Sequence, residues 1–286
     1  MRNKILYIYT ENLNFFYRLN RELIRLNIKF EVLNIRNKIP SHSSIMLTTS
    51  DEVHNFINIP EKLKILPYSI EENFEYYILK VLAAVKIGLK DSYLELLFSI
   101  DPGTTQIGIV VFLDDHYLQA HTVYENALFM DIIKNYIICF QHKKPNQLKI
   151  NFKLGRGVIP ITIDLLKLIY NSYKNRKFLK VYLIDEKKSS KIKINFKNMR
   201  INTKHEISAL ILALRKGVEV NINNYLKIIK EGKSQNFNNN EYNILEETGE
   251  GKIYLKEVID RLLINDIALS KASQLLSNFK SSKHEI

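Results

Sequence analysis

Apolar and polar positions alternate in two rhythms along the first 90 residues. Apolar residues spaced three and four positions apart predict a helix over Leu13–Asn27 and a second helix from Phe74 to Val85. The inward face of the first helix is predicted to consist of Phe16, Leu19, Leu23 and Leu26. Short apolar runs predict four strands, at Lys4–Tyr9, Phe30–Ile35, Ser44–Thr49 and Leu63–Leu66. Such alternation of strands and helices is typical of a small parallel sheet covered by helices.

From Glu95 the pattern changes to three strands in succession, and tight turns between them predict an antiparallel meander. Helices and strands then alternate again, so that the element order is βββαβαβα. The predicted elements are strands Leu96–Asp101, Gln106–Leu113 and His116–Tyr124, helix Ala127–Gln141, strand Gln147–Leu154, helix Ile161–Lys174, strand Leu179–Glu186 and a helix from about His205 to Arg215. Beyond residue 217 the chain reads as mostly helical, with short helices at Lys256–Leu263 and Leu269–Leu276.

A chain of 286 residues is long enough for two domains and a small third one. We therefore predict an α/β protein of three parts. Residues 1–90 form a small Rossmann-like parallel α/β domain, residues 95–217 form a mixed-sheet domain, and residues 218–286 form a helical C-terminal region. The first part has no Gly-rich phosphate loop, so a nucleotide site is not supported there.

Composition limits the compartment and the cofactors. The single cysteine, Cys139, excludes an intramolecular disulfide and a zinc site made of several thiolates. The longest unbroken apolar run, Ala209–Leu214, is far too short to cross a bilayer. These features predict a cytoplasmic protein that does not enter a membrane.

Charge is concentrated in one stretch of the chain. Residues 141–200 contain sixteen Lys or Arg and only three Asp or Glu, a net charge of +13 against +12 for the whole chain. A concentrated positive field attracts polyanions by neutralising phosphates and releasing their counterions. Nucleic acid is therefore the predicted partner, while a solvated lysine surface remains the simpler alternative.

Three motifs, in order, resemble the ribonuclease H-like superfamily, and within it the RuvC Holliday-junction resolvases and the YqgF family. The first is Ser99-Ile-Asp-Pro-Gly-Thr-Thr105, a strand that ends in an aspartate before a Gly turn. The second is the Asp185-Glu186 pair that closes the last strand, and the third is His205-Glu206 before an Ala-rich apolar helix. The resemblance covers about residues 95–217 and implies a ribonuclease H-like mixed sheet.

The resemblance also implies a catalytic set of Asp101, Asp185, Glu186, His205 and Glu206. In a Mg²⁺- or Mn²⁺-dependent endonuclease, carboxylates from separate strands and a helix hold two ions about 4 Å apart. Asp101 would be the shared ligand, and Glu186 and Glu206 would complete the metal set. Such an enzyme would act on structured DNA, as in DNA recombination, or on RNA, with DNA favoured.

One position departs from the family. RuvC enzymes place a glutamate at the end of the fourth strand, where this chain has Lys153 and Arg156 but no acid. A lysine there opposes metal binding and favours contact with phosphate. An inactive scaffold that binds nucleic acid or protein on a nuclease-like fold is therefore the alternative function. An actin-like ATPase, whose first phosphate loop Asp101-Pro-Gly-Thr-Thr105 also resembles, would need a second such lobe that the sequence lacks.

The residues expected to bind nucleic acid surround this acidic set. They are Lys153, Arg156, Lys187, Lys188, Lys191 and Lys193. A homodimer is implied by analogy with RuvC-type resolvases alone, and residues 1–90 are a candidate docking module for a protein partner.

Overall fold

A computed structural model describes residues 5–33, 43–56, 59–141, 147–186, 201, 203–221, 223–231 and 249–281. The chain divides into two units, Met1–Asp91 and Ser92–Ile286, and each is described by itself. Both units are α/β in class, with a four-stranded parallel sheet in the first and a six-stranded mixed sheet in the second. Among the described helices, none has the length and apolar character that a bilayer crossing requires.

The first unit contains the parallel sheet that the sequence predicts. Its strands lie in the order β2-β1-β3-β4, which confirms the four predicted strands. Their bounds are β1 Ile5–Ile8, β2 Phe30–Val32, β3 Ser44–Thr49 and β4 Leu63–Tyr68, and the helices are α1 Leu13–Arg25, the 3-10 helix η1 Ser50–Asn55 and α2 Phe74–Lys86. The prediction for the inner face of α1 was wrong at one position, because Phe15 is buried and Phe16 is only half-buried.

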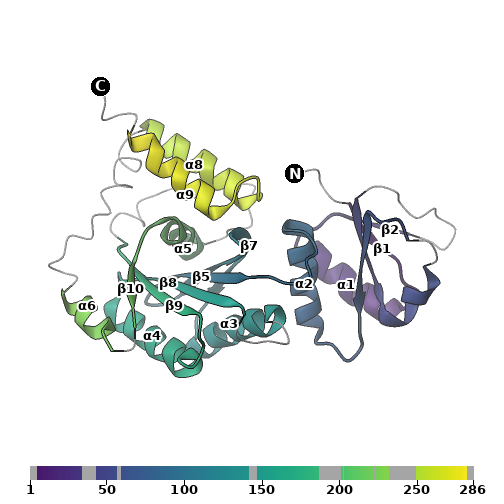
Figure 1. Cartoon of the computed structure of the whole chain (residues 1–286), viewed down its shortest axis with the longest axis horizontal. Coiled ribbons are helices and arrows are strands. Elements are labelled where there is room, and N and C mark those ends of the chain that lie inside the picture. The colour runs from purple at the N-terminus through teal and green to yellow at the C-terminus, as the bar shows by residue number, and fades with distance from the viewer. Residues whose placement is uncertain are drawn as a thin grey trace. The chain divides into compact units, whose positions relative to one another are not determined.

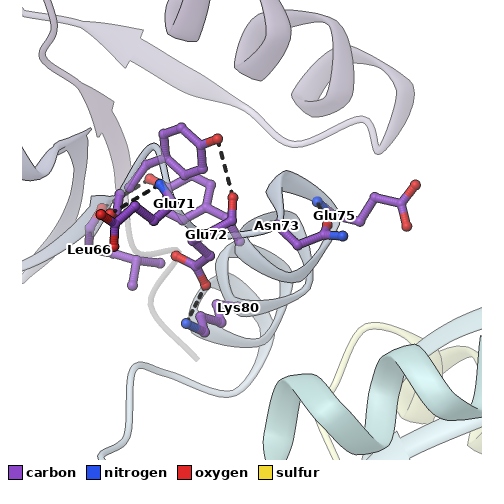
Figure 2. Close-up of polar contacts among 9 residues, drawn as sticks. Leu66, Glu71, Glu72, Asn73, Glu75 and Lys80 are labelled. Carbon is purple, nitrogen blue, oxygen red and sulfur yellow. Dashed lines mark hydrogen bonds and ion pairs between the residues drawn. The ribbon is translucent and has the colours of Figure 1, made fainter.

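Aromatic rings form much of the core beneath the two helices of this unit. Phe15 of α1 stacks on Tyr68 with ring centroids 5.1 Å apart, and Tyr77 of α2 lies edge-on to Phe15. The Tyr77 hydroxyl donates to the Leu66 carbonyl over 3.0 Å, and an ion pair joins Lys80 to Glu72 (Figure 2). These contacts fix the first turns of α2 against the end of β4.

A partly buried hydrogen-bond network lies at the carboxyl ends of β1 and β3. The strand order reverses there, which is where α/β sheets commonly bind ligands. The Glu52 carboxylate accepts hydrogen bonds from the Thr10 and Thr49 hydroxyls, at 2.8 and 2.6 Å, and from the Glu11 N–H at 2.5 Å. Burial acts to raise the pKa of Glu52, but these hydrogen bonds outweigh it and hold the pKa below its usual value. The Glu52 carboxylate is therefore bound by the chain itself at this end of the sheet.

The second unit has strands in the order β10-β9-β8-β5-β6-β7. The three predicted strands of the meander pair antiparallel, and the next two run parallel to the central strand β5. The strand bounds are β5 Glu95–Pro102, β6 Ile107–Leu113, β7 His116–Val123, β8 Lys149–Gly155, β9 Leu179–Ile184 and β10 Val218–Val220. The element order βββαβαβα is confirmed from β5 to the helix at Lys204–Leu214, whereas β10 was not predicted.

Helices cover both faces of the second sheet (Figure 1). On one side lie α3 and α4, and on the other lie α5, α8 and α9. The helix bounds are α3 Asn126–Phe140, α4 Ile159–Tyr173, α5 Lys204–Leu214, α6 Tyr225–Glu231, α8 Gly249–Leu263 and α9 Leu269–Ser281. Because α8 and α9 bury the outer face of α5, the apolar run of α5 is buried on both sides.

The β6–β7 turn anchors the C-terminal helices. Asp115 has a positive φ of 69° in this turn, and its carboxylate accepts from the Ser270 N–H at 3.1 Å, at the start of α9. The Asn265 side chain, between α8 and α9, donates to the Tyr117 carbonyl on β7 over 2.9 Å. The α8–α9 pair is therefore packed against the rest of the second unit.

Helix α5 rests on β6 at a residue without a side chain. A Cβ atom added to Gly108 would lie 2.2 Å from the His205 carbonyl oxygen, which is backbone and cannot swing aside. Further along, the buried Ser99 hydroxyl of β5 donates to the Ala209 carbonyl over 2.7 Å. These two contacts set the height and the position of α5 over the sheet.

Gly108→Ala is expected to push the first turn of α5 away from the sheet. Overpacking of this kind costs about 1–3 kcal/mol, so the midpoint of thermal unfolding of the second unit should fall by several degrees. Thr104→Ala, an exposed position in the same hairpin, serves as the control and should leave the midpoint unchanged. Equal midpoints for Gly108→Ala and the parent would contradict this account of how α5 is seated.

Candidate active site

The sheet gathers the predicted acidic residues along one edge of the second unit. Strands β5, β8 and β9 are parallel, so their carboxyl ends, at Asp101, Gly155 and Ile184, lie at the same edge. Asp185 and Glu186 follow β9 directly. The first turn of α5 packs over the β5–β6 hairpin and brings His205 to this edge of the sheet.

Asp101 and His205 are in direct hydrogen-bonded contact at this edge. His205 Nδ1 lies 2.7 Å from Asp101 Oδ2, although the residues are 104 positions apart in the chain. Burial raises the pKa of Asp101, while the hydrogen bond and the charge of His205 act to lower it. The imidazole packs over Gly103, where an added Cβ would lie 2.4 Å from His205 Cε1. Gly103 thus makes room for the ring, and the aspartate sets the ring's orientation.

The Glu186 carboxylate fits between two glycines. A Cβ at Gly155 would lie 1.9 Å from Glu186 Oε1, and a Cβ at Gly157 would lie 1.9 Å from Glu186 Oε2. Burial is the main cause that raises the pKa of Glu186 to about 7, and the negative charges of Asp101 and Asp185 raise it further. The Gly157 N–H and the Arg215 guanidinium act in the opposite direction. Glu186 is therefore held within electrostatic reach of both aspartates.

Two arginines hold the segment after β9. Arg156 Nη2 lies 3.8 Å from Asp185 Oδ2, and Arg215 Nη1 donates to the Asp185 carbonyl over 2.7 Å. Arg215 is only 2% exposed, so its positive charge lies inside the fold, close enough to Glu186 to affect the pKa of that carboxyl. The carboxylates of this edge thus share their surroundings with cations of the chain itself.

Glu206 faces a different part of the sheet. Its carboxylate accepts from the Thr122 hydroxyl over 2.8 Å, and Thr122 also bonds Thr203, the residue that caps α5. The pairing register places Thr122 opposite Gly108, which in turn lies opposite Asp101. Glu206 is therefore bound over β7, two strands away from Asp101.

The Lys153 ammonium group makes its hydrogen bonds inside the fold. Its ammonium group donates to the Ala213 carbonyl and, over 2.8 Å, to the Arg215 carbonyl at the end of α5. Burial lowers the pKa of Lys153 to about 8. The Lys153 ammonium group therefore binds the C-terminal end of α5, where a positive charge is favourable. The remaining residues expected to contact phosphate, Lys187, Lys188, Lys191 and Lys193, lie outside the described residues.

Sequence reasoning missed the residues that support the centre. Gly155 and Gly157 surround Glu186, Thr122 binds Glu206, and Arg215 reaches Asp185. The Gly-x-Gly pair directly after a buried strand was a usable signal, because such glycines often mark a close approach of another group. Nothing in the sequence distinguished Arg215 from an ordinary basic residue at a helix end.

The donor atoms of this edge are carboxylate oxygens, the ligands that hard cations prefer. Mg²⁺ is commonly bound by one or two carboxylates together with substrate phosphates, and Asp101 and Glu186 can supply those two. Burial is the largest cause of the raised pKa of Glu186 and the negative charge of Asp101 adds to it, an imbalance that a cation would relieve. Across the described part of the chain, no group of three or more His, Cys, Asp or Glu side chains is placed to hold an ion. The predicted metal set of Asp101, Glu186 and Glu206 is therefore not gathered around one position in these residues.

Comparisons with known proteins give little guidance. No family model matches the sequence, and no curated protein matches it. One solved structure that matches is Aa-Ago with externally bound siRNA, at 11% sequence identity and a TM-score of 0.21. The match covers 64% of this chain and 35% of that one, so the chain spans only part of that protein's length. A likeness of this degree carries no argument about function.

Glu186→Gln is expected to alter stability in a pH-dependent way. Folded Glu186 has a pKa of about 7 against an ordinary value of 4.5, so the folded protein retains a proton that the unfolded chain releases. The stability of the parent should therefore fall as the pH rises from about 4.5 to 7 and stay low above that. Glutamine does not titrate, so the midpoint difference, variant minus parent, should grow between pH 5 and pH 8 in the presence of a chelator. Glu257→Gln, exposed on α8, is the control, and a difference independent of pH at Glu186 would contradict the assignment.

Proposed function

We propose that the second unit is a ribonuclease H-like domain, similar to the RuvC and YqgF families, which binds nucleic acid and cleaves it in a metal-dependent reaction. The main support is the contact between Asp101 and His205 at the sheet edge where Glu186 also lies. These three side chains come from β5, the start of α5 and the segment after β9. Buried acids with raised pKa values that meet at one edge are typical of functional sites.

The topology agrees with this proposal. A three-stranded meander is followed by two parallel strands on its β5 side, and α5 then crosses the face of the sheet. The same arrangement is implied by the motifs at Asp101, Asp185 and His205. The net charge of +13 in residues 141–200 supplies the attraction for a phosphate backbone.

The residues divide the chemistry among themselves. Asp101, which bonds His205 through Oδ2, would hold an ion together with Glu186. A bound Mg²⁺ or Mn²⁺ would polarise the phosphate and offset its negative charge. When Nδ1 of His205 carries the proton shared with Asp101, Nε2 can accept a proton from an attacking water. Arg156, which lies beside Asp185, would stabilise charge on the phosphate.

A second function, binding without cleavage, is favoured by one observation. Several acids of the expected set are engaged by the chain itself, Asp185 with Arg156 and Glu206 with Thr122. The residue at the end of β8 is Gly155, where the related resolvases carry an acid. A domain of this kind would hold nucleic acid on the same basic surface.

Asp101→Asn separates these two functions, because it keeps the shape of the side chain and removes its charge. The parent is expected to cleave junction or flap DNA in Mn²⁺, and the variant should lose at least about 100-fold in rate while it still binds. Asp164→Asn, an exposed acid on α4, is the matched control and should cleave like the parent. Binding by both proteins with cleavage by neither would favour the non-catalytic function. Cleavage that survives in Asp101→Asn would mean that the reaction occurs elsewhere.

Binding to duplex DNA is expected to depend steeply on salt. If about six phosphates are neutralised, affinity should fall about 10³-fold between roughly 50 and 200 mM salt. Fluorescence anisotropy at several salt concentrations gives the slope directly. A flat slope, or no binding to DNA or RNA at any salt concentration, would count against the proposed function.

A further inference from the structure

We propose that Tyr124 is a stacking surface for an unpaired nucleobase next to the phosphate that the acidic centre binds. This inference rests on the proposed function and extends it to the class of substrate: nucleic acid with unpaired nucleotides at the cleavage position, such as a flap or a junction.

Strand pairing places Tyr124 at the same edge as the acidic centre. Pro102, Ile107 and Val123 form one row across β5, β6 and β7. Asp101 directly precedes this row, and Tyr124 directly follows it. Since neighbouring strands lie about 4.8 Å apart, the backbone at Tyr124 is about 10 Å from that of β5. A nucleotide adjacent to one at Asp101 can therefore bring its base to Tyr124.

Exposure distinguishes Tyr124 from the other aromatic residues of β7 and α3. Its side chain is 69% exposed, whereas Tyr117, Phe129 and Tyr136 are all buried. Leu128, in the first turn of α3, is also exposed, at 48%. Both exposed side chains are uncharged and lie where β7 leads into α3.

The negative charge next to Tyr124 favours an uncharged base over a phosphate at this position. Glu125 follows Tyr124 and is exposed, so its carboxylate repels a phosphate backbone from this position. An uncharged base is not repelled, and aromatic rings stack on bases of every sequence. A fully paired duplex keeps its bases inside the helix, so only an unpaired nucleotide can use this surface.

The test uses the full chain without divalent ions, so that cleavage does not interfere. The probes are a flap DNA with 2-aminopurine at the unpaired position next to the branch and a fully paired duplex of equal length. Tyr124→Ala should weaken flap binding about tenfold, leave duplex binding unchanged and abolish the stacking-induced quenching of 2-aminopurine. Tyr124→Phe should behave like the parent. Tyr17→Ala, a tyrosine 66% exposed on α1 of the other unit, is the matched control and should have no effect.

Each other outcome overturns the inference in a recognisable way. Unchanged flap affinity and quenching in Tyr124→Ala, with normal binding by the parent, would refute the role of Tyr124 and leave the proposed function intact. Equal losses on flap and duplex would mean that Tyr124 contacts nucleic acid without selecting an unpaired base. Failure of the parent to bind either probe would refute the proposed function, and the role of Tyr124 with it.

Discussion

The second unit depends on the close packing of α5 against the sheet. Gly108 lets the backbone of α5 approach β6 to a distance that any side chain would prevent. Ser99 bonds the middle of the helix, and Lys153 bonds its last carbonyls. Because the helix is fixed at its start, middle and end, His205 is held against Asp101 and Arg215 is held against the segment that carries Glu186. The position of one helix thus determines the geometry of the whole acidic edge.

That edge is an electrostatic compromise. Three carboxyl groups, of Asp101, Asp185 and Glu186, interact in a partly buried space, and repulsion between them adds to the cost of removing each from water. Arg156 and Arg215 offset part of this cost, and the raised pKa of Glu186 indicates that a part remains. Proteins tolerate such local imbalance mainly where function requires it.

Much of the fold was accessible from the sequence, because its elements are long and strongly patterned. The meander and the parallel strands follow from apolar runs such as Ile107–Leu113, which lie between turn residues and are typical of buried strands. The site was accessible in part: Asp101 and His205 were named and do meet. The orientation of Glu206 was not accessible, because it depends on Thr122, a residue 84 positions away that carries no signal of its own. The hydrogen bonds of Lys153 were not accessible for a similar reason, since only the folded chain brings the end of α5 to that side chain.

The hydrogen bond between Asp115 and the start of α9 has a consequence for folding during synthesis on the ribosome. Asp115 accepts a hydrogen bond from Ser270, which lies 155 residues later in the first turn of α9. During synthesis the sheet and α5 are complete well before α8 and α9 leave the exit tunnel, so the outer apolar face of α5 stays open to water until then. Contacts this distant in sequence also make folding slow. The nascent chain therefore exposes the apolar outer face of α5 while the residues between Leu214 and Leu269 are synthesised, and it is prone to aggregate during that interval.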